Sequence, residues 1–559
     1  MAETQQEQRF LDWLADALVA CGTRFSFGVP GGGASLDLLL AMQQRKVRNV
    51  ICAREDAAVI MASVAGVLAR APGLAFTTKG PGVSSATNGI ACAALDRFSP
   101  LVIGEAFVPS ELSFLSHQYF DQSALVAPLL ARDHAASLEP SPHSVSAWLQ
   151  DGAWPPRGPA VLFAESGDYA EPANSASFDA SAVISGNRAA QLALRPELEV
   201  QLKAAASSLA KAERPVVVLG LEASRGLAPA TLARLVEVLQ APVLCTYMAK
   251  GVLPDVHPQW AGVFTGGAIE QQCVREADLI VAIGIDPVEL IRKPWPYEVP
   301  MVELCEEIYT PHYYAPKIRA VAPLNVTVER LHQLLDGPVA SLWMPAQVSA
   351  HRERFLDALR ISPTHSSLAA ASPDSSMVVS VAAAAFAGPL RPRVTVDAGA
   401  HMFSACAFWP CEEPLDLLIS NGLATMGFAL PAAIAAALHE PERGALAFTG
   451  DGGLLMCLGE LKTAAEMQAN VCVVVFNDAR LSLIDIKRED RQMPDLDLSW
   501  RAPNFAEIAQ GCGLQGWRVE NATQLEAALT EAAACSGPCL VDVRVESAGY
   551  RQQLQSLRG

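Results

Sequence analysis

The sequence predicts an α/β protein made of three doubly wound parallel-sheet domains. Short apolar runs such as PVVVLGL (215–221), DLIVAIGI (278–285) and VCVVVF (471–476) have the composition of strands buried on both faces. Ala-rich segments with helical spacing alternate with them, which favours parallel sheets covered by helices. A chain of 559 residues with 51% apolar residues is long enough for several domains with large cores.

Two polar stretches that contain Pro and Ser, 168–190 and 337–377, predict linkers between these domains. We therefore expect domains at 1–170, 190–337 and 375–550. The middle domain is expected to be Rossmann-like, because strand-helix-strand patterns recur between the two linkers.

Charge and composition exclude several classes of protein. The net charge of −18 argues against nucleic acid and anionic membranes as partners. No apolar stretch has the length and character of a membrane span, apart from the Ala-rich segment 422–438, which a motif described below explains. The start, MAETQQEQRF, lacks the basic region of a signal peptide. Thirteen scattered cysteines form no C-x-x-C pair, so we expect reduced thiols in a cytoplasmic protein.

The first candidate site begins with a strand, RFSFGVP (24–30), then Gly31, Gly32 and Gly33, and then an apolar helix. This order is also found in dinucleotide-binding folds. However, Leu36 occupies the position of the last glycine of that fingerprint, and no ribose-binding acidic residue stands out further along. A nicotinamide-dependent enzyme is therefore disfavoured.

The next segments place a carboxylate between a short strand and a helix. Glu55 lies in NVICAREDAAVIMASVAGVLAR (49–70), and LAFTTKGPGVSSATNGIACAALDRFSPLVIGEA (74–106) follows. Taken alone, Glu55 has the position of a glutamate that stabilises a helix start.

The most informative stretch runs from Gly450 to Asp478. It predicts a strand, a Gly-Asp-Gly-Gly turn, a helix, a second strand and the pair Asn477-Asp478. Glycines and the free N–H groups of a helix start favour phosphate. Asp451 adds a hard oxygen ligand, and the second strand returns another oxygen beside it. The pattern therefore indicates a divalent cation that holds a diphosphate.

These motifs, in this order, resemble the thiamine diphosphate (ThDP)-dependent enzymes, in the branch of acetolactate synthase and benzoylformate decarboxylase. The resemblance continues through KGVLPDVHP (250–258), DAGAH (397–401) and NGLATMGFALPAAIAAAL (421–438), and it covers nearly the whole chain. It implies that the N-terminal domain binds the pyrimidine of ThDP and that the C-terminal domain binds its diphosphate.

The resemblance also assigns roles to residues. Glu55 becomes the carboxylic acid that bonds the pyrimidine N1′, so that the cofactor can deprotonate its own thiazolium carbon. Its apolar neighbours in the sequence are expected to raise its pKa above the usual value of about 4.3. Met426 is implied as the support for the bend of the cofactor, although core packing would also explain it. Ala424 replaces a usual glycine, but the family uses its carbonyl.

For the metal, the resemblance implies Asp451, Asp478 and the main-chain oxygen of Arg480. Asp478 stands where the family usually has Asn, and a one-residue slip that makes Asn477 the ligand stays open. His401 matches a residue that contacts the diphosphate, with a structural role as the alternative. The remaining residues implied in cofactor binding are Pro30, Gly31, Gly80, Asn88, Ala400, Gly450, Gly452 and Gly453.

On the substrate side, SHQYFDQSALVAPLL (116–130) resembles a segment of acetolactate synthases, and Gln118 matches their active-site glutamine. His117 is a candidate proton donor or carboxylate partner, or a loop cap. Gly32 is a candidate backbone contact of the reacting intermediate. Lys487 and Arg488 could steer an anion or lie on a solvated face.

The predicted function is a ThDP- and Mg²⁺-dependent enzyme that decarboxylates a 2-oxo acid, with or without carboligation. FAD is not expected, because GIDPVELIRKPWPYE (284–298) replaces the segment that serves flavin in biosynthetic relatives. The alternatives are a 2-hydroxyacyl-CoA lyase and a catalytically silent ThDP-binding paralogue. The resemblance implies a homodimer or a dimer of dimers.

Overall fold

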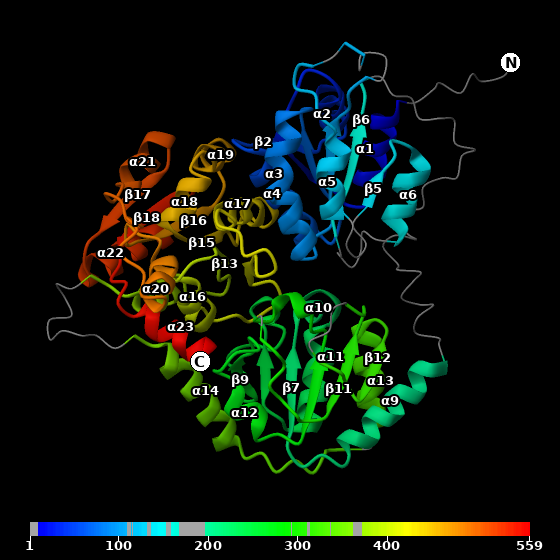
Figure 1. Ribbon diagram of the computed structural model, residues 1–559, viewed down its shortest axis with the longest axis vertical. Helices are drawn as coiled ribbons and strands as arrows, with labels where there is room; N and C mark the ends of the chain where they lie inside the picture. The colour runs from blue at the N-terminus through cyan, green and yellow to red at the C-terminus, as the bar shows by residue number, and fades with distance from the viewer. Residues whose placement is uncertain are drawn as a thin grey trace. The chain divides into compact units, whose positions relative to one another are not determined.

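The structure is a computed structural model that describes residues 9–108, 113–114, 116–130, 136–151, 158–166, 196–291, 293–309, 314–335, 337–361 and 372–559 (Figure 1). Its strands form three six-stranded sheets, and every strand pair within them is parallel. The predicted α/β fold with three parallel sheets is confirmed.

The first sheet has the order β2-β1-β3-β4-β6-β5. Its strands are β1 (Phe25–Val29), β2 (Arg48–Ile51), β3 (Gly73–Thr77), β4 (Pro100–Glu105), β5 (Ala136–Leu138) and β6 (Ala160–Ala164). Its helices are α1 (Phe10–Ala20), α2 (Ala34–Gln44), α3 (Glu55–Ala69), α4 (Pro81–Leu95), α5 (Gln122–Leu130) and α6 (Pro142–Asp151). Helices α1, α2 and α6 share one hydrophobic core with the sheet, whereas α3 packs against β1 and β3.

The second sheet has the order β12-β11-β10-β7-β8-β9, the usual Rossmann arrangement. Its strands are β7 (Pro215–Leu219), β8 (Val243–Cys245), β9 (Trp260–Val263), β10 (Leu279–Ile283), β11 (Met301–Cys305) and β12 (Ile318–Val321). Its helices are α9 (Pro196–Leu209), α10 (Leu221–Gly226), α11 (Pro229–Leu239), α12 (Gln271–Arg275), α13 (Leu324–Leu334) and α14 (Pro345–Leu359), with short 3₁₀ turns η2 (Tyr247–Ala249) and η3 (Pro287–Glu289).

The third sheet, β14-β13-β15-β16-β18-β17, repeats the relative strand order of the first. Its strands are β13 (Arg393–Val396), β14 (Leu417–Ile419), β15 (Ala445–Gly450), β16 (Val471–Asn477), β17 (Gln515–Val519) and β18 (Cys539–Arg544). The helices of this part of the chain are α15 (Ser375–Ala385), α16 (Met402–Phe408), α17 (Ala429–His439), α18 (Asp451–Met456), α19 (Glu460–Met467), α20 (Ser482–Asp490), α21 (Phe505–Cys512), α22 (Ala522–Ala533) and α23 (Tyr550–Arg558).

The chain forms two compact units that do not follow sequence order. Unit 1 contains residues 1–188 with 422–444 and 457–470, and unit 2 contains 189–421, 445–456 and 471–559. Helices α17 and α19 therefore belong with the first sheet, and α17 packs on α3.

Close packing explains why α3 is almost entirely apolar. Its residues from Ala57 to Val67 are buried, and it contacts both α4 and α17. Glycines permit this approach: a Cβ at Gly66 would lie 2.7 Å from the nitrogen of Gly73, and one at Gly89 would lie 2.5 Å from the oxygen of Asp56. Helix α3 is thus held rigidly behind its first residue, Glu55.

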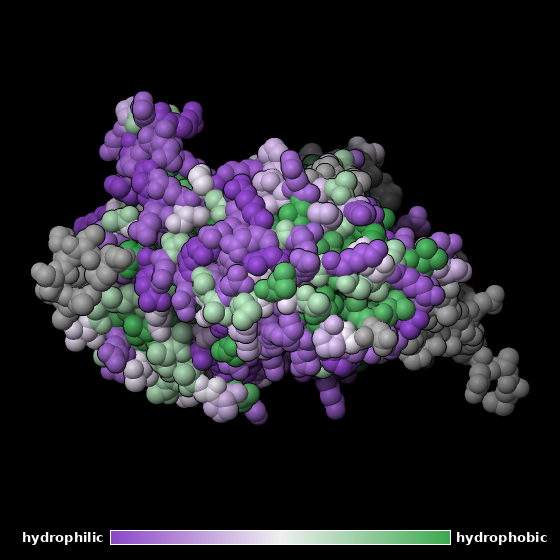
Figure 2. All heavy atoms as spheres, turned by 90° about the horizontal axis from the view of Figure 1, so that it is seen from below, coloured by the Kyte–Doolittle hydropathy of each residue, from purple (hydrophilic) through white to green (hydrophobic). Residues whose placement is uncertain are grey.

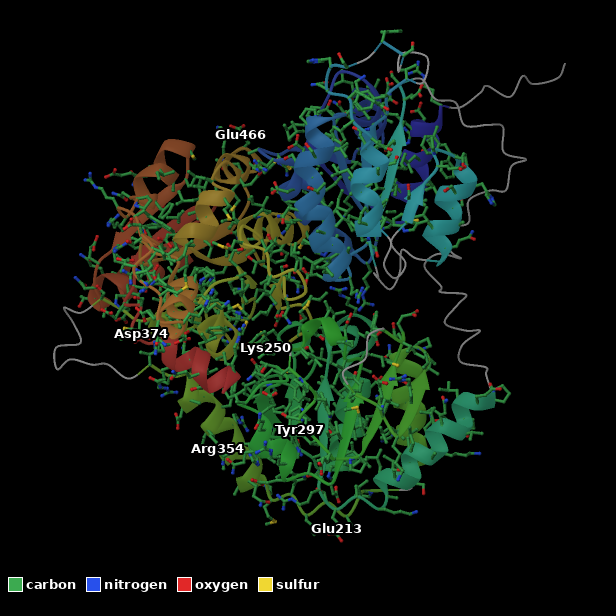
Figure 3. All side chains as sticks on the ribbon, in the orientation of Figure 1. Glu213, Lys250, Tyr297, Arg354, Asp374 and Glu466 are labelled. Carbon is green, nitrogen blue, oxygen red and sulfur yellow. The ribbon has the colours of Figure 1, made fainter. Side chains whose placement is uncertain are left out.

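Within unit 2, the KGVLPDVHP segment makes a buried ion pair. Lys250, labelled in Figure 3, lies 2.6 Å from Asp255, and its side chain is fully buried. The same Asp255 oxygen accepts a bond from the nitrogen of Cys411 at 3.1 Å. The motif therefore joins the second and third sheets within one unit.

One linker prediction is wrong in part. Helix α14 occupies 345–359, inside the polar stretch 337–377. Pro345 starts the helix, and Val348, Phe355 and Leu359 are buried along one side, so widely spaced apolar residues were enough. The other predicted linker, 168–190, lies outside the described residues, as do residues 1–8. The predicted domain boundaries stay predictions.

Among the described residues, no helix combines the length and apolar character needed to cross a bilayer. All thirteen cysteines carry free thiols. On the face drawn in Figure 2, apolar residues are interspersed with hydrophilic ones. Large exposed apolar side chains include Ile51 in unit 1 and Leu455 and Met456 in unit 2.

Candidate active site in two halves

Glu55 is the first residue of α3 and is half-buried. Gly82 lies beside it, since a Cβ there would be 3.3 Å from Oε1 of Glu55. The apolar setting expected for Glu55 is only partial in this chain, because Ile51 is 53% exposed. Ala57 and Val59 are buried as expected.

A second carboxylate, missed in the sequence, fixes the turn before Glu55. Oε1 of Glu460 accepts bonds from the nitrogens of Ala53 (3.1 Å) and Arg54 (3.0 Å), and Thr463 donates to its Oε2 at 2.7 Å. Burial raises the pKa of Glu460. The glutamate comes from α19 and belongs to unit 1, so it positions the start of α3.

The glycine loop after β1 is shaped by Glu105, which also went unnoticed. Oε1 of Glu105 accepts bonds from the nitrogen of Gly33 (3.0 Å) and from the hydroxyl of Ser35 (2.8 Å), and Thr78 donates to Oε2 at 3.2 Å. A Cβ at Gly31 would lie 2.3 Å from the Thr78 hydroxyl, so only glycine fits there. Pro30 is half-buried, and Gly32 is exposed with nothing within 4 Å of a Cβ.

The loop after β3 brings Gly80 and Gln118 together. Gly80 has a φ of +66°, and a Cβ there would lie 2.5 Å from the oxygen of Gln118. Buried Gln122 accepts from the nitrogen of Gly80 at 2.6 Å and donates to the Glu105 oxygen at 3.1 Å. His117 and Gln118 are exposed.

The Met426 loop is attached to α4 in the same unit. Asn88 donates to the hydroxyl of Thr425 at 3.2 Å, and the nitrogen of Gly422 donates to Asp96 at 2.6 Å. Met426 is half-buried. Ala424 has a φ of +55°, in the left-handed region that glycine adopts more easily than alanine. Unit 1 therefore contains Glu55, Gln118, Asn88 and Met426, and Asn88 is bonded to the loop that carries Met426.

In unit 2, the Gly450–Gly453 turn buries a carboxylate at the end of β15. Asp451 is 3% exposed, and its Oδ1 accepts from the nitrogen of Gly452 at 2.9 Å. Its Oδ2 is buried with no hydrogen-bond donor. Burial, and then the charge of Asp478, raise the pKa of Asp451 to about 7. A Cβ at Gly453 would lie 2.2 Å from Oδ2 of buried Asp397, another residue that the sequence reasoning missed.

Side-chain contacts distinguish the two residues after β16. The side-chain amide of Asn477 is fully buried, and its hydrogen bonds are all made within the protein. It donates to Asp542 (2.8 Å) and to the oxygen of Pro503 (3.2 Å), and it accepts from Arg544 (2.6 Å). Asp478 is half-buried and accepts a bond from Ser482, and burial raises its pKa. This geometry favours Asp478 over Asn477 as a ligand.

These carboxylates fit a divalent cation. Asp451 and Asp478 interact unfavourably as like charges, and Asp451 has an oxygen without a donor. No cluster of three or more His, Cys, Asp or Glu side chains suited to a metal is found in the described part of the chain. A site of two carboxylates completed by main-chain and diphosphate oxygens would not need one. Arg480 points its exposed side chain to Asp485 at 2.8 Å.

His401 lies beside this turn. It is 3% exposed, stacks on Phe476 with ring centroids 5.0 Å apart, and lies 3.5 Å from a Cβ placed at Gly450. Burial lowers its pKa to about 4, so the ring is neutral near pH 7. Its Nε2 is buried without a partner. The ring can therefore give or accept a hydrogen bond, but it supplies no charge. Ala400, just before it, is buried.

Of the two basic residues singled out on α20, Arg488 and Lys487, one forms an ion pair within the helix. Arg488 pairs with Asp485 at 2.6 Å, while Lys487 forms no ion pair among the described residues.

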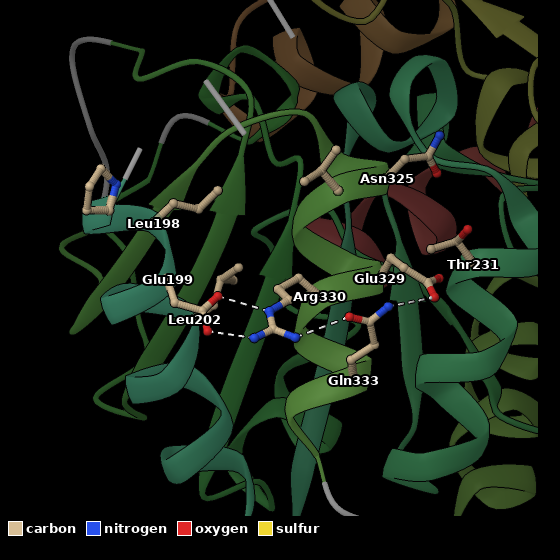
Figure 4. Close-up of a pocket in the computed structure, with 10 residues that line it drawn as sticks. Leu198, Glu199, Leu202, Thr231, Asn325, Glu329, Arg330 and Gln333 are labelled. Carbon is tan, nitrogen blue, oxygen red and sulfur yellow. Dashed lines mark hydrogen bonds and ion pairs between the residues drawn. The ribbon is translucent and has the colours of Figure 1, made fainter. Parts of the chain in front are cut away.

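A pocket of about 740 Å³ lies elsewhere, on the helices of the second sheet (Figure 4). Arg330 lies between Glu199 (2.7 Å) and Gln333 (3.3 Å) in its wall. The pocket contains none of the predicted site residues. The pocket lies away from the strand ends, so we assign it no part in the chemistry.

Comparisons with known proteins identify the family. Three family models match: "Thiamine pyrophosphate enzyme, N-terminal TPP binding domain" at 8–125, its "central domain" at 202–300 and its "C-terminal TPP binding domain" at 397–543. The chain belongs to the thiamine pyrophosphate (ThDP) enzymes. It is a ThDP-dependent enzyme of the decarboxylase and carboligase class, related to acetolactate synthases and 2-oxo acid decarboxylases.

Two relatives cover almost the whole chain. Acetolactate synthase of Bacillus subtilis is 26% identical over 98% of this chain and 96% of its own length. The "Probable 2-ketoarginine decarboxylase AruI" of Pseudomonas aeruginosa is 28% identical over 95% and 93%. The solved structure of the ThDP-dependent 4-hydroxybenzoylformate decarboxylase of Rhodococcus jostii RHA1 has the same fold, with a TM-score of 0.79, 20% identity and coverage of 96% and 99%.

Proposed function

We propose that this enzyme uses ThDP with Mg²⁺ to decarboxylate a 2-oxo acid, with or without transfer of the remaining fragment to an acceptor. The observation that carries the proposal is the buried, donor-free oxygen of Asp451 beside Asp478, at the end of β15. The names of the relatives, which include acetolactate synthases and 2-oxo acid decarboxylases, support the same reaction class.

ThDP, when bound, supplies a nucleophilic thiazolium carbon that attacks a carbonyl and holds the electron pair released when a C–C bond breaks. In this proposal Glu55 shares a proton with the pyrimidine N1′. Met426 supports the bend of the cofactor. Asn88 holds the loop that carries Met426 through its hydrogen bond to Thr425. Pro30, Gly31 and Gly80 give the backbone its close approach.

In the other half, Asp451, Asp478 and the main-chain oxygen of Arg480 hold Mg²⁺. Gly450, Gly452 and Gly453 present backbone N–H groups to the diphosphate, as helix starts commonly do. His401 adds a neutral hydrogen bond, with Ala400 packed behind it, and we expect no bound FAD.

On the substrate side, Gln118, His117 and the exposed backbone of Gly32 face the 2-oxo acid in our proposal. His117 is exposed and can give or accept a proton there.

We further propose that the two halves are completed by a second copy, as a homodimer or a dimer of dimers. Large apolar side chains stand exposed close to both halves: Ile51 (53%) near Glu55, and Leu455 (43%) and Met456 (57%) just after Asp451. Exposed apolar groups beside a polar site favour a covering surface. The free thiols favour a cytoplasmic location.

The test is CO₂ release from a panel of 2-oxo acids, measured with ThDP and Mg²⁺, with either one omitted, and with EDTA. Release that requires both supports the proposal. Wild-type protein that binds ThDP yet releases no CO₂ from any acid would contradict it and favour the silent paralogue. Mass determination by light scattering would contradict the dimer if the active species were a monomer.

A further inference from the structure

We propose that Lys79 forms a subsite for a carboxylate that stays on the product, namely that of an acceptor 2-oxo acid. This inference rests on the proposed function and refines its substrate class. It would make the enzyme a carboligase selective for acceptors with a carboxylate.

Lys79 lies at the point where the first sheet changes direction. Strands β1 and β3 are neighbours, and their connections lead to opposite sides of the sheet. In such sheets the crevice beyond the carboxyl ends of the two strands is the usual place for a ligand. Strand β3 ends at Thr77, so Lys79 is two residues into this crevice.

The Lys79 side chain packs against an aromatic ring. It is half-buried, and its Nζ lies 5.4 Å from the centre of the Phe107 ring, a favourable cation–π distance. Tyr119 packs edge-on against Phe107, with ring centroids 5.1 Å apart. Across the residues that the structure describes, no acidic side chain forms an ion pair with Lys79.

The rest of the loop connects this cation to the predicted site. Gly80 touches Gln118, Gly82 lies next to the carboxylate of Glu55, and Thr78 donates to Glu105. The charge of Glu105 is directed elsewhere, because its oxygens accept from the backbone and hydroxyl groups at the start of α2. Lys79 therefore presents an ammonium that has no counter-ion among the described residues, in a loop that also contacts Gln118 and Glu55 through Gly80 and Gly82.

The chemistry decides which carboxylate this ammonium suits. A carboxylate that leaves as CO₂ loses its charge as its bond breaks, so an ion pair with it would stabilise the ground state and slow the step. A carboxylate that persists keeps its ion pair throughout and gains binding. In a protein of net charge −18, an anionic acceptor also needs a local cation to offset the general repulsion.

The test compares two acceptors that differ by one carboxylate, 2-oxobutanoate and propanal. The donor is the acid of the panel that wild type decarboxylates fastest. For Lys79→Met we expect the KM for 2-oxobutanoate to rise by roughly 10- to 100-fold, as for loss of a charged hydrogen bond. The KM for propanal and the CO₂ release from the donor alone should change less than about twofold by the same reasoning.

Two further variants sharpen the result. Lys46→Met, which removes an exposed lysine of the same domain, should leave both acceptors unaffected. Phe107→Leu keeps the charge but loses the ring, and it should raise the KM for 2-oxobutanoate by a smaller factor, about threefold, consistent with an exposed cation–π contact. The proposal would be overturned if Lys79→Met raised the KM for both acceptors equally, or if it impaired CO₂ release from the donor alone.

A second measurement does not depend on turnover. Wild-type ThDP-loaded protein, reductively ¹³C-dimethylated at lysine, is titrated with oxamate, an unreactive analogue of a 2-oxo acid. The Lys79 resonance, assigned by its absence in Lys79→Met or Lys79→Arg, should shift saturably, while that of Lys46 stays fixed. An unshifted Lys79 resonance would overturn the subsite even if CO₂ release supports the reaction. A shifted one would support the subsite even if no acid is decarboxylated.

Discussion

The outer and central sheets differ in what fills the crevice at their strand ends. In the central sheet the crevice is closed by the protein itself: a Cβ at Gly220 would lie 2.4 Å from the oxygen of Gly284. Glu289 accepts from the nitrogen of Leu221 at 2.7 Å, and Glu306 accepts from the nitrogen of Leu324 at 3.0 Å. The helix starts that could receive a phosphate already hold carboxylates.

The corresponding positions of the outer sheets hold functional groups with unused bonding capacity. Asp451 Oδ2 and His401 Nε2 have no partner, as is also true of Glu289 Oε1 in the central crevice, and Lys79 has no counter-ion among the described residues. A carboxylate also holds a helix start in the first sheet, where Glu105 caps α2, so the outer crevices differ from the central one in carrying Lys79, Asp451 and His401. Strand order locates the possible sites, but side chains decide which of them are used.

The largest expected effect is on proton exchange at the thiazolium C2 of ThDP, which should need Glu55 of the first outer crevice but not Glu289 of the central crevice. For Glu55→Gln we expect exchange of the thiazolium C2 proton of bound ThDP to slow by roughly 10²- to 10⁴-fold, the usual scale for a lost acid–base group. ThDP affinity should change little. Glu289→Gln, in the closed crevice, should leave exchange at the wild-type rate. Proton NMR of quenched exchange samples measures this, and unchanged exchange in Glu55→Gln would remove Glu55 from the proposal.

Two buried groups, His401 beside the Asp451 turn and Glu289 in the central crevice, should respond oppositely to pH. Burial lowers the pKa of His401 to about 4, so the unfolded chain, with a pKa near 6.5, takes up a proton first as pH falls. Its stability contribution is complete above pH 6.5 and is lost between about 6.5 and 4. Burial raises the pKa of Glu289 to about 8, so its contribution is complete below about pH 4.5 and is lost as pH rises to about 8.

The loss is about 3 kcal/mol for His401 and about 5 kcal/mol for Glu289, at 1.36 kcal/mol per pKa unit. Urea unfolding of wild type, His401→Gln and Glu289→Gln from pH 4 to 8 measures it. We expect His401→Gln to flatten the acidic side of the profile and Glu289→Gln to flatten the basic side. If both variants changed the same side, one of the two assignments would be wrong.

These crevices also mark how far sequence reasoning could reach. Buried strands and the Gly-Asp-Gly turn depend on local composition, so the fold class, the three sheets and the positions of Glu55 and Asp451 were predictable. Glu105, Asp397 and Glu460 were not, because each acts on a turn that is distant in the sequence. Asn477 and Asp478 could be distinguished only once β16 paired with β18, which brings Arg544 to the amide of Asn477.

A smaller effect contrasts two adjacent glycines in the first crevice. Gly31→Ala would place a methyl group 2.3 Å from the Thr78 hydroxyl and 2.5 Å from Glu105. We expect a loss of about 1–3 kcal/mol, as for other overpacked sites. The added methyl group of Gly32→Ala meets nothing within 4 Å. The free energy of unfolding of this variant should therefore stay within about 0.5 kcal/mol of wild type, as for other surface changes. Thermal melting of the two variants side by side would contradict this geometry if they were equally destabilised.

The last prediction is that nucleotides, for which the central crevice is the candidate site, do not change the thermal stability of the protein. ADP, coenzyme A and FAD should leave the melting temperature unchanged. ThDP with Mg²⁺ at 100 times its Kd should stabilise by about 2.7 kcal/mol. Differential scanning fluorimetry compares them directly. A rise with ADP or coenzyme A would reopen the central crevice and favour the 2-hydroxyacyl-CoA lyase instead.

The membership of α17 and α19 in unit 1 has a practical consequence for dissection of the enzyme. Helix α3 is covered by α17, and the turn before it is fixed by Glu460 of α19. A fragment cut after the first sheet would expose that apolar surface and release the turn that carries Glu55. Limited proteolysis should therefore not liberate a folded N-terminal third, and the pyrimidine-binding part should be expressible only together with sequence from the far end of the chain.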